Sequence, residues 1–219
     1  MNHLTLVFDL DGTLTDSRPG IVRCFVHALR SLGARVPEAA QIESLIGAPL
    51  RGAFVTLLGS DAFADDAVTV FREMYAVSGL YECAVYAGVE SVIESLQRES
   101  AAMFVATSKP HVFAERVLEH CGLSRFFRRV YGAELTGERA DKRELLAHVL
   151  QEETLDPAEM VMIGDRSHDV IAARANGAHS IGVAWGYGSV DELRSAGADR
   201  ICATPAELIR CVGAVAVAC

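Results

Sequence analysis

A chain of 219 residues is long enough to bury a hydrophobic core unaided, and it fits one large domain or one domain that carries a smaller insertion. Its formal net charge of −9 argues against a nucleic-acid partner, because the phosphate backbone would be repelled. The six cysteines form no C-x-x-C pair, and neither end reads as a signal peptide or a membrane span. We therefore expect a reduced, cytoplasmic protein with no membrane role.

Six short apolar runs along the chain predict buried β-strands. The runs are continuous rather than alternating, which is typical of parallel strands covered on both faces, and helical patterns separate them. The sequence therefore predicts an α/β fold with a doubly wound parallel sheet. The predicted strands are 4–9, 102–107, 128–132, 160–165, 180–185 and 199–203, and the helices between them are 88–99, 111–121, 141–152, 168–176 and 204–216.

The segment between the first two predicted strands is far longer than one crossover connection needs. It contains four helical patterns, and the turn-rich stretches TDSRPG and GLYECAVYAG bound it. We expect a helical cap domain at 17–84, inserted into a core domain of 1–16 and 85–219. The predicted cap helices are 21–33, 43–47, 50–59 and 65–79.

Aspartates follow two of the predicted strands. Asp9 ends the first run and Asp11 comes two positions later, while Asp165 ends the fourth run and Asp169 follows in GDRSHD. Because parallel strands all end at one edge of a sheet, we expect these carboxylates to lie together. A single aspartate in such a place can simply be the N-cap of the next helix. Carboxylates held close together raise each other's cost of ionisation unless a cation lies between them, so the cluster predicts a site for Mg²⁺.

The second predicted strand ends in a hydroxyl and an ammonium group, at Thr107, Ser108 and Lys109. A magnesium site beside such groups suits phosphoryl transfer, in which the charge on the phosphoryl oxygens must be neutralised. A carboxylate can also act as the nucleophile in this chemistry, through an aspartyl-phosphate intermediate. The three strand ends together therefore indicate an enzyme that acts on phosphate groups.

Four motifs, DLDGTLTD, VATSKP, RADKRELL and IGDRSHD, together resemble those of the haloacid dehalogenase (HAD) superfamily, and specifically its phosphatases with a helical cap. In motif style the chain is similar to phosphoglycolate phosphatases and bacterial 5'-nucleotidases. The resemblance implies that Asp9 attacks phosphorus, and that Asp11 protonates the leaving oxygen and then activates water. It implies that Thr107 and Lys142 hold the phosphoryl oxygens.

The resemblance also implies a set of magnesium ligands. These are Asp9, the main-chain carbonyl of Asp11, and Asp165, with Asp169 binding through water or orienting the other ligands. Gly12 would let the chain turn sharply beside them.

Three cations and two hydroxyls, one of them that of Thr107, are candidates for holding the substrate. Many relatives have a KPxP stretch at the lysine, which this chain lacks, so Lys142 could instead be an exposed lysine at a helix start. Lys109 is then the replacement, unless it is a solvated loop residue, and Ser108 is a substrate-binding candidate beside it. Arg51, near a turn of the cap, could meet a second anionic group of the substrate or could be a solvated residue.

Three other signals have simpler interpretations. Cys24 and Arg30 have the spacing of cysteine-dependent phosphatases, but the segment is helical and without glycine, so we expect Cys24 to be packed in the cap. We expect His168 to be a polar residue that opens a helix. The stretch WGYGS lacks a complete nucleotide-binding pattern, so it predicts a turn near the site, with Trp185 and Tyr187 as lining residues.

The sequence favours a Mg²⁺-dependent phosphatase for a small phosphorylated metabolite, such as a phosphoglycolate-like compound or a nucleoside monophosphate. The alternatives are a phosphomutase of the same fold, similar to β-phosphoglucomutase, and a non-catalytic phospho-accepting module. Asp11 favours turnover, because an acid and base beside the nucleophile has no use in a stable phospho-switch. We expect a monomer or a homodimer.

Overall fold

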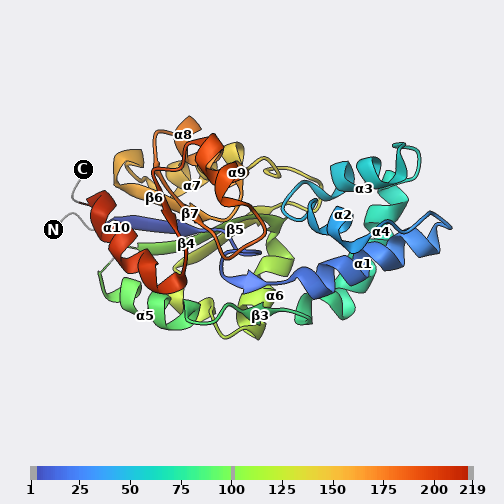
Figure 1. The fold of residues 1–219 in the computed structure, drawn as a ribbon, viewed down its shortest axis with the longest axis horizontal. Helices are drawn as coiled ribbons and strands as arrows, with labels where there is room; N and C mark the ends of the chain where they lie inside the picture. The colour runs from blue at the N-terminus through green and yellow to red at the C-terminus, as the bar shows by residue number, and fades with distance from the viewer. Residues whose placement is uncertain (1–3, 100–101, 217–219) are drawn as a thin grey trace. The chain divides into compact units, whose positions relative to one another are not determined.

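The structure is a computed structural model that describes residues 4–99 and 102–216. The chain divides into two compact units (Figure 1). Residues 1–16 and 85–219 make up the core unit, and residues 17–84 make up the inserted unit. Two short paired strands, β2 (Thr15–Asp16) and β3 (Ala84–Val85), lie where the chain passes from one unit to the other.

A six-stranded sheet forms the centre of the core unit (Figure 1). The strand order is β5-β4-β1-β6-β7-β8, and every pairing is parallel. The order runs outward from β1 in both directions, so the topological switch point of the sheet lies at β1. This confirms the predicted fold class. The strands are β1 Thr5–Phe8, β4 Ala102–Pro110, β5 Arg129–Ala133, β6 Met160–Gly164, β7 His179–Val183 and β8 Arg200–Cys202.

Helices cover both faces of this sheet. On one face Val7, Phe104 and Met162 pack in a core with residues of α7 and α8, while on the other Phe8 and Ile163 face α5 and α10. Burial on both sides explains why the strands are apolar without alternation. The helices are α5 Val89–Glu99, α6 His111–His120, α7 Lys142–Glu153, α8 Ser167–Ala175, α9 Val190–Ala196 and α10 Leu208–Ala216, with 3₁₀ turns at Ser124–Phe126, Pro157–Glu159 and Pro205–Glu207.

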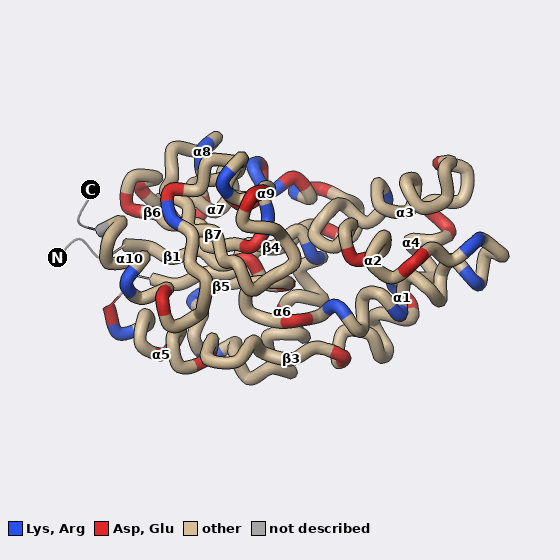
Figure 2. Tube along the Cα trace, in the orientation of Figure 1, with Lys and Arg blue, Asp and Glu red and all other residues tan. Residues whose placement is uncertain are grey.

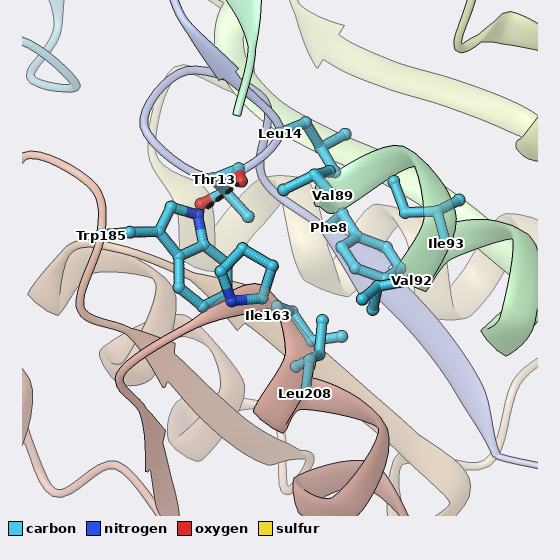
Figure 3. Close-up of a pocket in the computed structure, with 10 residues that line it drawn as sticks. Phe8, Thr13, Leu14, Val89, Val92, Ile93, Ile163, Trp185 and Leu208 are labelled. Carbon is cyan, nitrogen blue, oxygen red and sulfur yellow. Dashed lines mark hydrogen bonds between the residues drawn. The ribbon is translucent and has the colours of Figure 1, made fainter. Parts of the chain in front are cut away.

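A small apolar cavity lies on the face of the sheet that carries Phe8 (Figure 3). Its volume is about 10 Å³, and at one side the Trp185 Nε1 donates a hydrogen bond of 3.1 Å to the Thr13 carbonyl. A cavity of this size is a packing feature and cannot take a substrate. It is lined by Phe8, Thr13, Leu14, Val89, Val92, Ile93, Ile163, Trp185, Pro205 and Leu208.

The inserted unit is helical. Its helices are α1 Arg18–Ser31, α2 Ala39–Glu43, α3 Leu50–Leu58 and α4 Ala64–Val77, followed by a 3₁₀ turn at Gly79–Tyr81. Phe25, Phe54, Phe71 and Tyr75 contact one another ring against ring and form the centre of its core. Cys24 is fully buried, and burial raises the pKa of its thiol to about 11, so it is a packing residue and not a nucleophile.

The prediction of a helix at 43–47 is wrong. The helix α2 lies earlier, at Ala39–Glu43, and turns follow it. Gly47 has a φ of +93°, outside the helical region, and the proline at position 49 disfavours helical geometry at Ala48. The sequence also did not predict β2, β3 and α9.

Charges of both signs are interspersed along the helices of both units (Figure 2). Within the inserted unit Arg23 pairs with Glu82, and Arg18 lies 3.6 Å from Glu43. Among the described residues, no helix is both long and apolar enough to cross a membrane. Among the described residues no disulfide links Cys24, Cys83, Cys121, Cys202 and Cys211, and Cys219 lies outside the described residues.

Candidate active site

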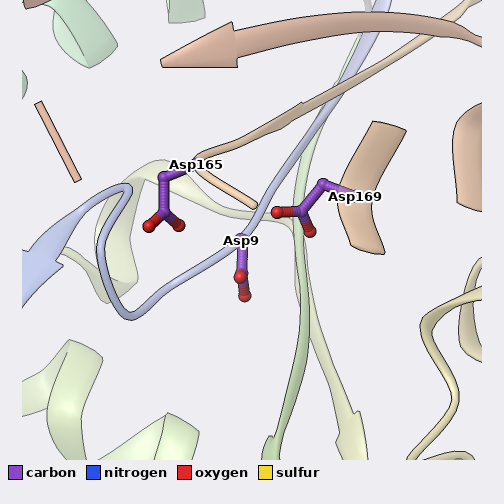
Figure 4. Close-up of side chains that lie close together, drawn as sticks. All are labelled: Asp9, Asp165 and Asp169. Carbon is purple, nitrogen blue, oxygen red and sulfur yellow. The ribbon is translucent and has the colours of Figure 1, made fainter. Parts of the chain in front are cut away.

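Three buried carboxylates meet at the carboxyl end of the sheet (Figure 4). Asp9 follows β1, Asp165 follows the neighbouring strand β6, and Asp169 lies in the first turn of α8. One oxygen of each carboxylate lies within 4.8 Å of the others. These three of the four predicted aspartates thus come together at the switch point of the sheet, where open α/β sheets bind ligands.

Lys142 lies against two of the three carboxylates of this cluster. Its Nζ is 2.9 Å from an oxygen of Asp9 and 2.9 Å from one of Asp169, and it donates a hydrogen bond of 2.9 Å to the Ala106 carbonyl. Burial alone would lower the pKa of Lys142, but the carboxylates of Asp169 and Asp9 outweigh it and raise the pKa above its usual value. Lys142 is therefore a charged, buried residue of the site, and the alternative of an exposed lysine is excluded.

The charge of the cluster fits a divalent cation. Three carboxylates and one ammonium leave two negative charges in a buried place, and the carboxylate oxygens are hard ligands. Burial, together with the neighbouring carboxylates, raises the pKa of Asp165 to about 7; burial also raises that of Asp169 to about 6, against the opposing charge of Lys142. Ionisation of these two carboxyl groups is thus costly without a cation. Because a bound cation favours the ionised carboxylates that it needs as ligands, the cluster suits a metal site.

Asp11 points to a different partner from Asp9. Its carboxylate accepts a hydrogen bond of 2.7 Å from the Nζ of Lys109, which follows Thr107 at the end of β4. Both side chains are largely buried, with exposed fractions of 6% for Lys109 and 12% for Asp11. Lys109 is therefore not a solvated loop residue, and its ammonium group forms an ion pair with the carboxylate of Asp11.

The two hydroxyls near the end of β4 have partners within the fold. Thr107 is buried, and its Oγ1 accepts a hydrogen bond of 3.3 Å from the backbone N–H of Lys109. The Ser108 Oγ donates a hydrogen bond of 3.2 Å to the Ala140 carbonyl, in the segment that leads to α7. Ser108 thereby links two loops at this edge of the sheet, and its contact with substrate stays a prediction.

Gly12 is required by the geometry of the site. Its φ of +87° lies in the left-handed region, and a Cβ at this position would lie 2.3 Å from a carboxylate oxygen of Asp165. The turn after β1 can therefore approach β6 only with a glycine here. Thr13, the next residue, donates a hydrogen bond of 3.2 Å from its Oγ1 to the same carboxylate of Asp165.

Arg51 belongs to the inserted unit, where it lies on α3. Its Nε donates a hydrogen bond of 2.9 Å to Asp65, and its Nη2 lies 3.4 Å from the second oxygen of that carboxylate. The hydrogen bond that Arg51 donates to Asp65 raises the pKa of Arg51. A contact between Arg51 and the substrate stays a prediction.

The segment after β7 lies at the site, as the turn predicted at WGYGS implied, and it adds hydrogen bonds that the sequence did not predict. The backbone N–H of Tyr187 donates a hydrogen bond of 2.7 Å to Asp165, and its hydroxyl lies 3.2 Å from Asp16. Glu192, on α9, accepts hydrogen bonds from the residues that follow Asp165. The sequence signal at Glu192 was the pattern S-x-x-E at 189–192, which marks a helix start.

The family model of the haloacid dehalogenase-like hydrolases matches residues 6–183, a range that contains the four predicted aspartates of this site and both of its lysines. The chain belongs to this family. A HAD hydrolase named 5'-nucleotidase, from Pseudomonas aeruginosa, is 44% identical over 209 residues, which cover 95% of each chain. The tyrosine-protein kinase PtkA of Mycobacterium tuberculosis is 38% identical over 85% of this chain and 64% of its own length.

Similarity to other HAD proteins extends over the whole chain. A phosphoglycolate phosphatase of Vibrio parahaemolyticus is 27% identical over 94% of this chain and 95% of its own. A crystal structure from Clostridium acetobutylicum, described as that of a predicted phosphatase, superimposes with a TM-score of 0.91 at 34% identity and covers 96% of this chain and 98% of that one. The HAD fold of the chain is thus matched in known structures.

Proposed function

We propose that the protein is a Mg²⁺-dependent phosphatase that hydrolyses a small phosphate monoester through an aspartyl-phosphate at Asp9. The observation that carries this proposal is the buried cluster of Asp9, Asp165 and Asp169, two of which pair with Lys142. Names of relatives, a 5'-nucleotidase and a phosphoglycolate phosphatase, support the same class of reaction. Asp9, Asp165 and Asp169 would hold the cation, and when bound it would neutralise charge on the phosphoryl oxygens.

In the first half of the reaction a carboxylate oxygen of Asp9 attacks phosphorus. The new bond joins Asp9 to phosphorus, the bond to the leaving oxygen breaks, and Asp11 gives its proton to that oxygen. Asp9 is held for this attack, because its Oδ1 accepts hydrogen bonds from the Leu10 N–H at 2.7 Å and from Lys142 at 2.9 Å. Thr107 and Lys142 bind the phosphoryl oxygens.

In the second half a water molecule attacks the same phosphorus. Asp11 takes a proton from the water, the bond between Asp9 and phosphorus breaks, and inorganic phosphate leaves. The same residue thus serves as acid and then as base, which returns the site to its starting state. This return is what distinguishes a phosphatase from a phospho-accepting module, in which the phosphate stays.

Metal dependence can be tested directly with p-nitrophenyl phosphate. We expect hydrolysis with Mg²⁺, loss of activity in excess chelator, and recovery when Mg²⁺ is restored. Asp165→Asn should remove most of the activity, while Asp191→Asn, at an exposed carboxylate on α9, is the matched control and should not. Full activity in metal-free buffer would rule the mechanism out.

The substrate class that we favour is the nucleoside 5'-monophosphates, because the relative of 44% identity is named 5'-nucleotidase. A panel of nucleoside monophosphates, phosphoglycolate, sugar phosphates and phosphotyrosine, compared by kcat/KM with Mg²⁺ present, tests this choice. A phosphomutase would instead return the phosphate to a sugar without releasing it, so inorganic phosphate should be measured with each compound. Preference for any other member of the panel would overturn the choice but not the phosphatase.

The inserted unit is proposed to select the leaving group, with Arg51 as the residue that meets a second anionic group. Arg51→Ala should then change the ranking of substrates more than it changes activity on p-nitrophenyl phosphate. Arg35→Ala, at another exposed arginine of the same unit, is the control. An equal loss on every substrate would remove Arg51 from this role.

A further inference from the structure

The helix α8 begins without the side-chain cap that its position calls for. Its first residue is Ser167, and its N-cap residue is Arg166. The first N–H groups of a helix lack acceptors within the helix, and an N-cap Ser, Thr, Asp or Asn usually supplies one. A guanidinium has only donors, so Arg166 cannot do this with its side chain. An acceptor for the start of α8 must come from elsewhere in the fold.

Glu192, from the neighbouring helix α9, supplies that acceptor. Its Oε1 accepts a hydrogen bond of 2.8 Å from the backbone N–H of Ser167 and one of 3.0 Å from the Nε of Arg166. Burial alone would raise the pKa of Glu192, but these bonds outweigh it and hold the pKa below its usual value. Glu192 is therefore an ionised carboxylate placed on the N-terminus of α8, where the helix dipole favours negative charge.

Local sequence would assign Glu192 to its own helix. Ser189 is the N-cap of α9, its Oγ accepts a hydrogen bond of 3.0 Å from the N–H of Glu192, and the pattern S-x-x-E is that of a capping box. In a capping box the glutamate reaches back to its own N-cap residue. Here the Oε1 of Glu192 instead joins α9 to the start of α8, 25 residues earlier in the chain.

The loop that Glu192 holds is the one that carries two of the metal-site carboxylates. Arg166 and Ser167 lie directly between Asp165 and Asp169, and Asp169 Oδ2 accepts a hydrogen bond of 3.1 Å from the Arg166 N–H. The chain before α9 contacts the same loop, since a Cβ at Gly188 would lie 2.0 Å from the Asp165 carbonyl oxygen. The loop is thus held from one side by α9 and the segment before it.

We propose that Glu192 is a positioning residue of the metal site, which fixes the loop 165–169 and so sets the spacing of Asp165 and Asp169. The inference rests on the magnesium dependence proposed above. Glu192 itself lies outside the carboxylate cluster and acts through Ser167 and Arg166. Because outer residues of this kind orient the ligands, their loss weakens metal binding while the ligands themselves stay present.

The test is a calorimetric titration of the chelated protein with Mg²⁺ in the absence of substrate, for the unsubstituted chain and for three variants. Glu192→Ala should raise the Kd for Mg²⁺ by about tenfold or more. Glu192→Gln should lie in between, because its amide oxygen still accepts from Ser167 but carries no charge. Asp191→Asn, whose carboxylate is exposed and pairs with Arg194, should leave the Kd unchanged.

Kinetics separate a positioning role from a merely structural one. For Glu192→Ala we expect the Mg²⁺ concentration of half-maximal activity to rise by the same factor, and kcat at saturating Mg²⁺ to recover. A lower Tm with an unchanged Kd for Mg²⁺ would overturn the inference, because Glu192 would then be a helix cap alone. If Glu192→Ala does not fold, Glu192→Gln decides by the same criterion.

Three further outcomes are distinguishable. An unsubstituted chain that binds no Mg²⁺ in the calorimeter would overturn the magnesium proposal and this inference with it. An unsubstituted chain that binds Mg²⁺ with the same Kd as Glu192→Ala and Glu192→Gln would overturn the inference alone. An equal effect of Asp191→Asn would do the same, because it would trace the change to the charge of α9 and not to the contact with α8.

Discussion

The two aspartates of the D-x-D motif, although only two positions apart, form separate ion pairs. Asp9 pairs with Lys142, inside the carboxylate cluster, while Asp11 pairs with Lys109 at the end of β4. A strand places alternate residues on the same face, but β1 ends at Phe8, so this alternation does not hold for the two aspartates. This separation of partners is the structural basis on which we assign different roles to the two carboxylates.

Substitution of each aspartate tests that division of labour. Asp9→Asn should abolish turnover without any phosphoenzyme, because the attacking oxygen has lost its charge. Asp11→Asn should slow both half-reactions, with the smaller effect on substrates whose leaving groups need little protonation. With p-nitrophenyl phosphate an aspartyl-phosphate should accumulate in Asp11→Asn and be visible by intact mass. Equal and complete loss in both variants, whatever the leaving group, would refute the assignment.

The buried pair of Lys109 and Asp11 also predicts a stability effect. Lys109→Met should lower the free energy of unfolding by about 3 kcal/mol, because a largely buried Asp11 is left without its ammonium partner. The double variant Lys109→Met, Asp11→Asn should regain part of this loss, since the unpaired charge is gone. Urea unfolding of the two single variants and the double variant measures the coupling. Additive effects would contradict it.

At the scale of elements, the start of α7 is what brings Lys142 into the site. Asp141 is the N-cap, and its carboxylate accepts a hydrogen bond of 2.8 Å from the N–H of Arg143. The hydrogen bonds from the Arg143 side chain and backbone lower the pKa of Asp141 to about 2. The charged residues next to Lys142 left open, in the sequence, whether it is an exposed lysine at a helix start. The structure shows that these neighbours begin its helix, α7.

Removal of this cap gives a pH-dependent prediction. Asp141→Ala should lower the free energy of unfolding by about 1 kcal/mol at pH 7. Because the pKa of Asp141 is lowered in the folded chain, its contribution is present above about pH 4 and is lost as pH falls through 2. Urea unfolding at pH 7 and pH 3 should therefore show a smaller difference at pH 3. Asp141→Asn, which keeps a capping oxygen but does not titrate, is the control: its loss at pH 7 should be smaller than that of Asp141→Ala and should also narrow toward pH 3. A difference that grows toward acid would contradict the account.

At the scale of the whole molecule, the sheet concentrates uncompensated negative charge at the switch point of its strands. Asp9, Asp165 and Asp169 arrive there because β1 and β6 are neighbours and α8 starts directly after β6. Ionisation of all three groups in this buried place is costly, so a bound cation, or protonation of one of the carboxylates, would stabilise the core. We therefore expect metal, pH and global stability to be coupled in this protein.

Thermal unfolding with chelator and with Mg²⁺ should reveal this coupling. In chelator, stability should fall as pH rises from about 4 to 7, by up to about 1.4 kcal/mol per pH unit for each proton, because the raised pKa values of Asp165 and Asp169 make the folded chain hold more protons. The stabilisation by Mg²⁺ should be larger at pH 8 than at pH 5.5, because the cation competes with those protons. Equal Tm shifts at the two pH values, at matched ionic strength, would argue against a metal at this cluster.

Much of the fold and part of the site were predictable because they depend on patterns that are local in the chain. A short continuous apolar run is typical of a parallel strand covered on both faces, and the carboxyl ends of such strands lie along one edge of the sheet. The proximity of Asp9 and Asp165 therefore followed from their positions at the ends of two such runs. Short helices were less predictable. The five-residue α2 was misplaced because its few residues carry little periodic signal beside Gly47.

Only the tertiary structure decided which side chains pair within the site. The sequence left open which of Lys109 and Lys142 holds the phosphoryl group. The structure distinguishes them by the carboxylate that each ammonium group pairs with in the interior, which is far away in the chain: Lys109 and Asp11 are 98 residues apart. Glu192 lies in a local capping pattern, yet its Oε1 accepts a hydrogen bond from the Ser167 N–H at the start of α8. Packing brings this N–H, which has no acceptor within its own helix, close to Glu192. The sequence determined at which strand and helix ends the charged groups of this protein lie. Burial and long-range packing determined which opposite charge each of them pairs with.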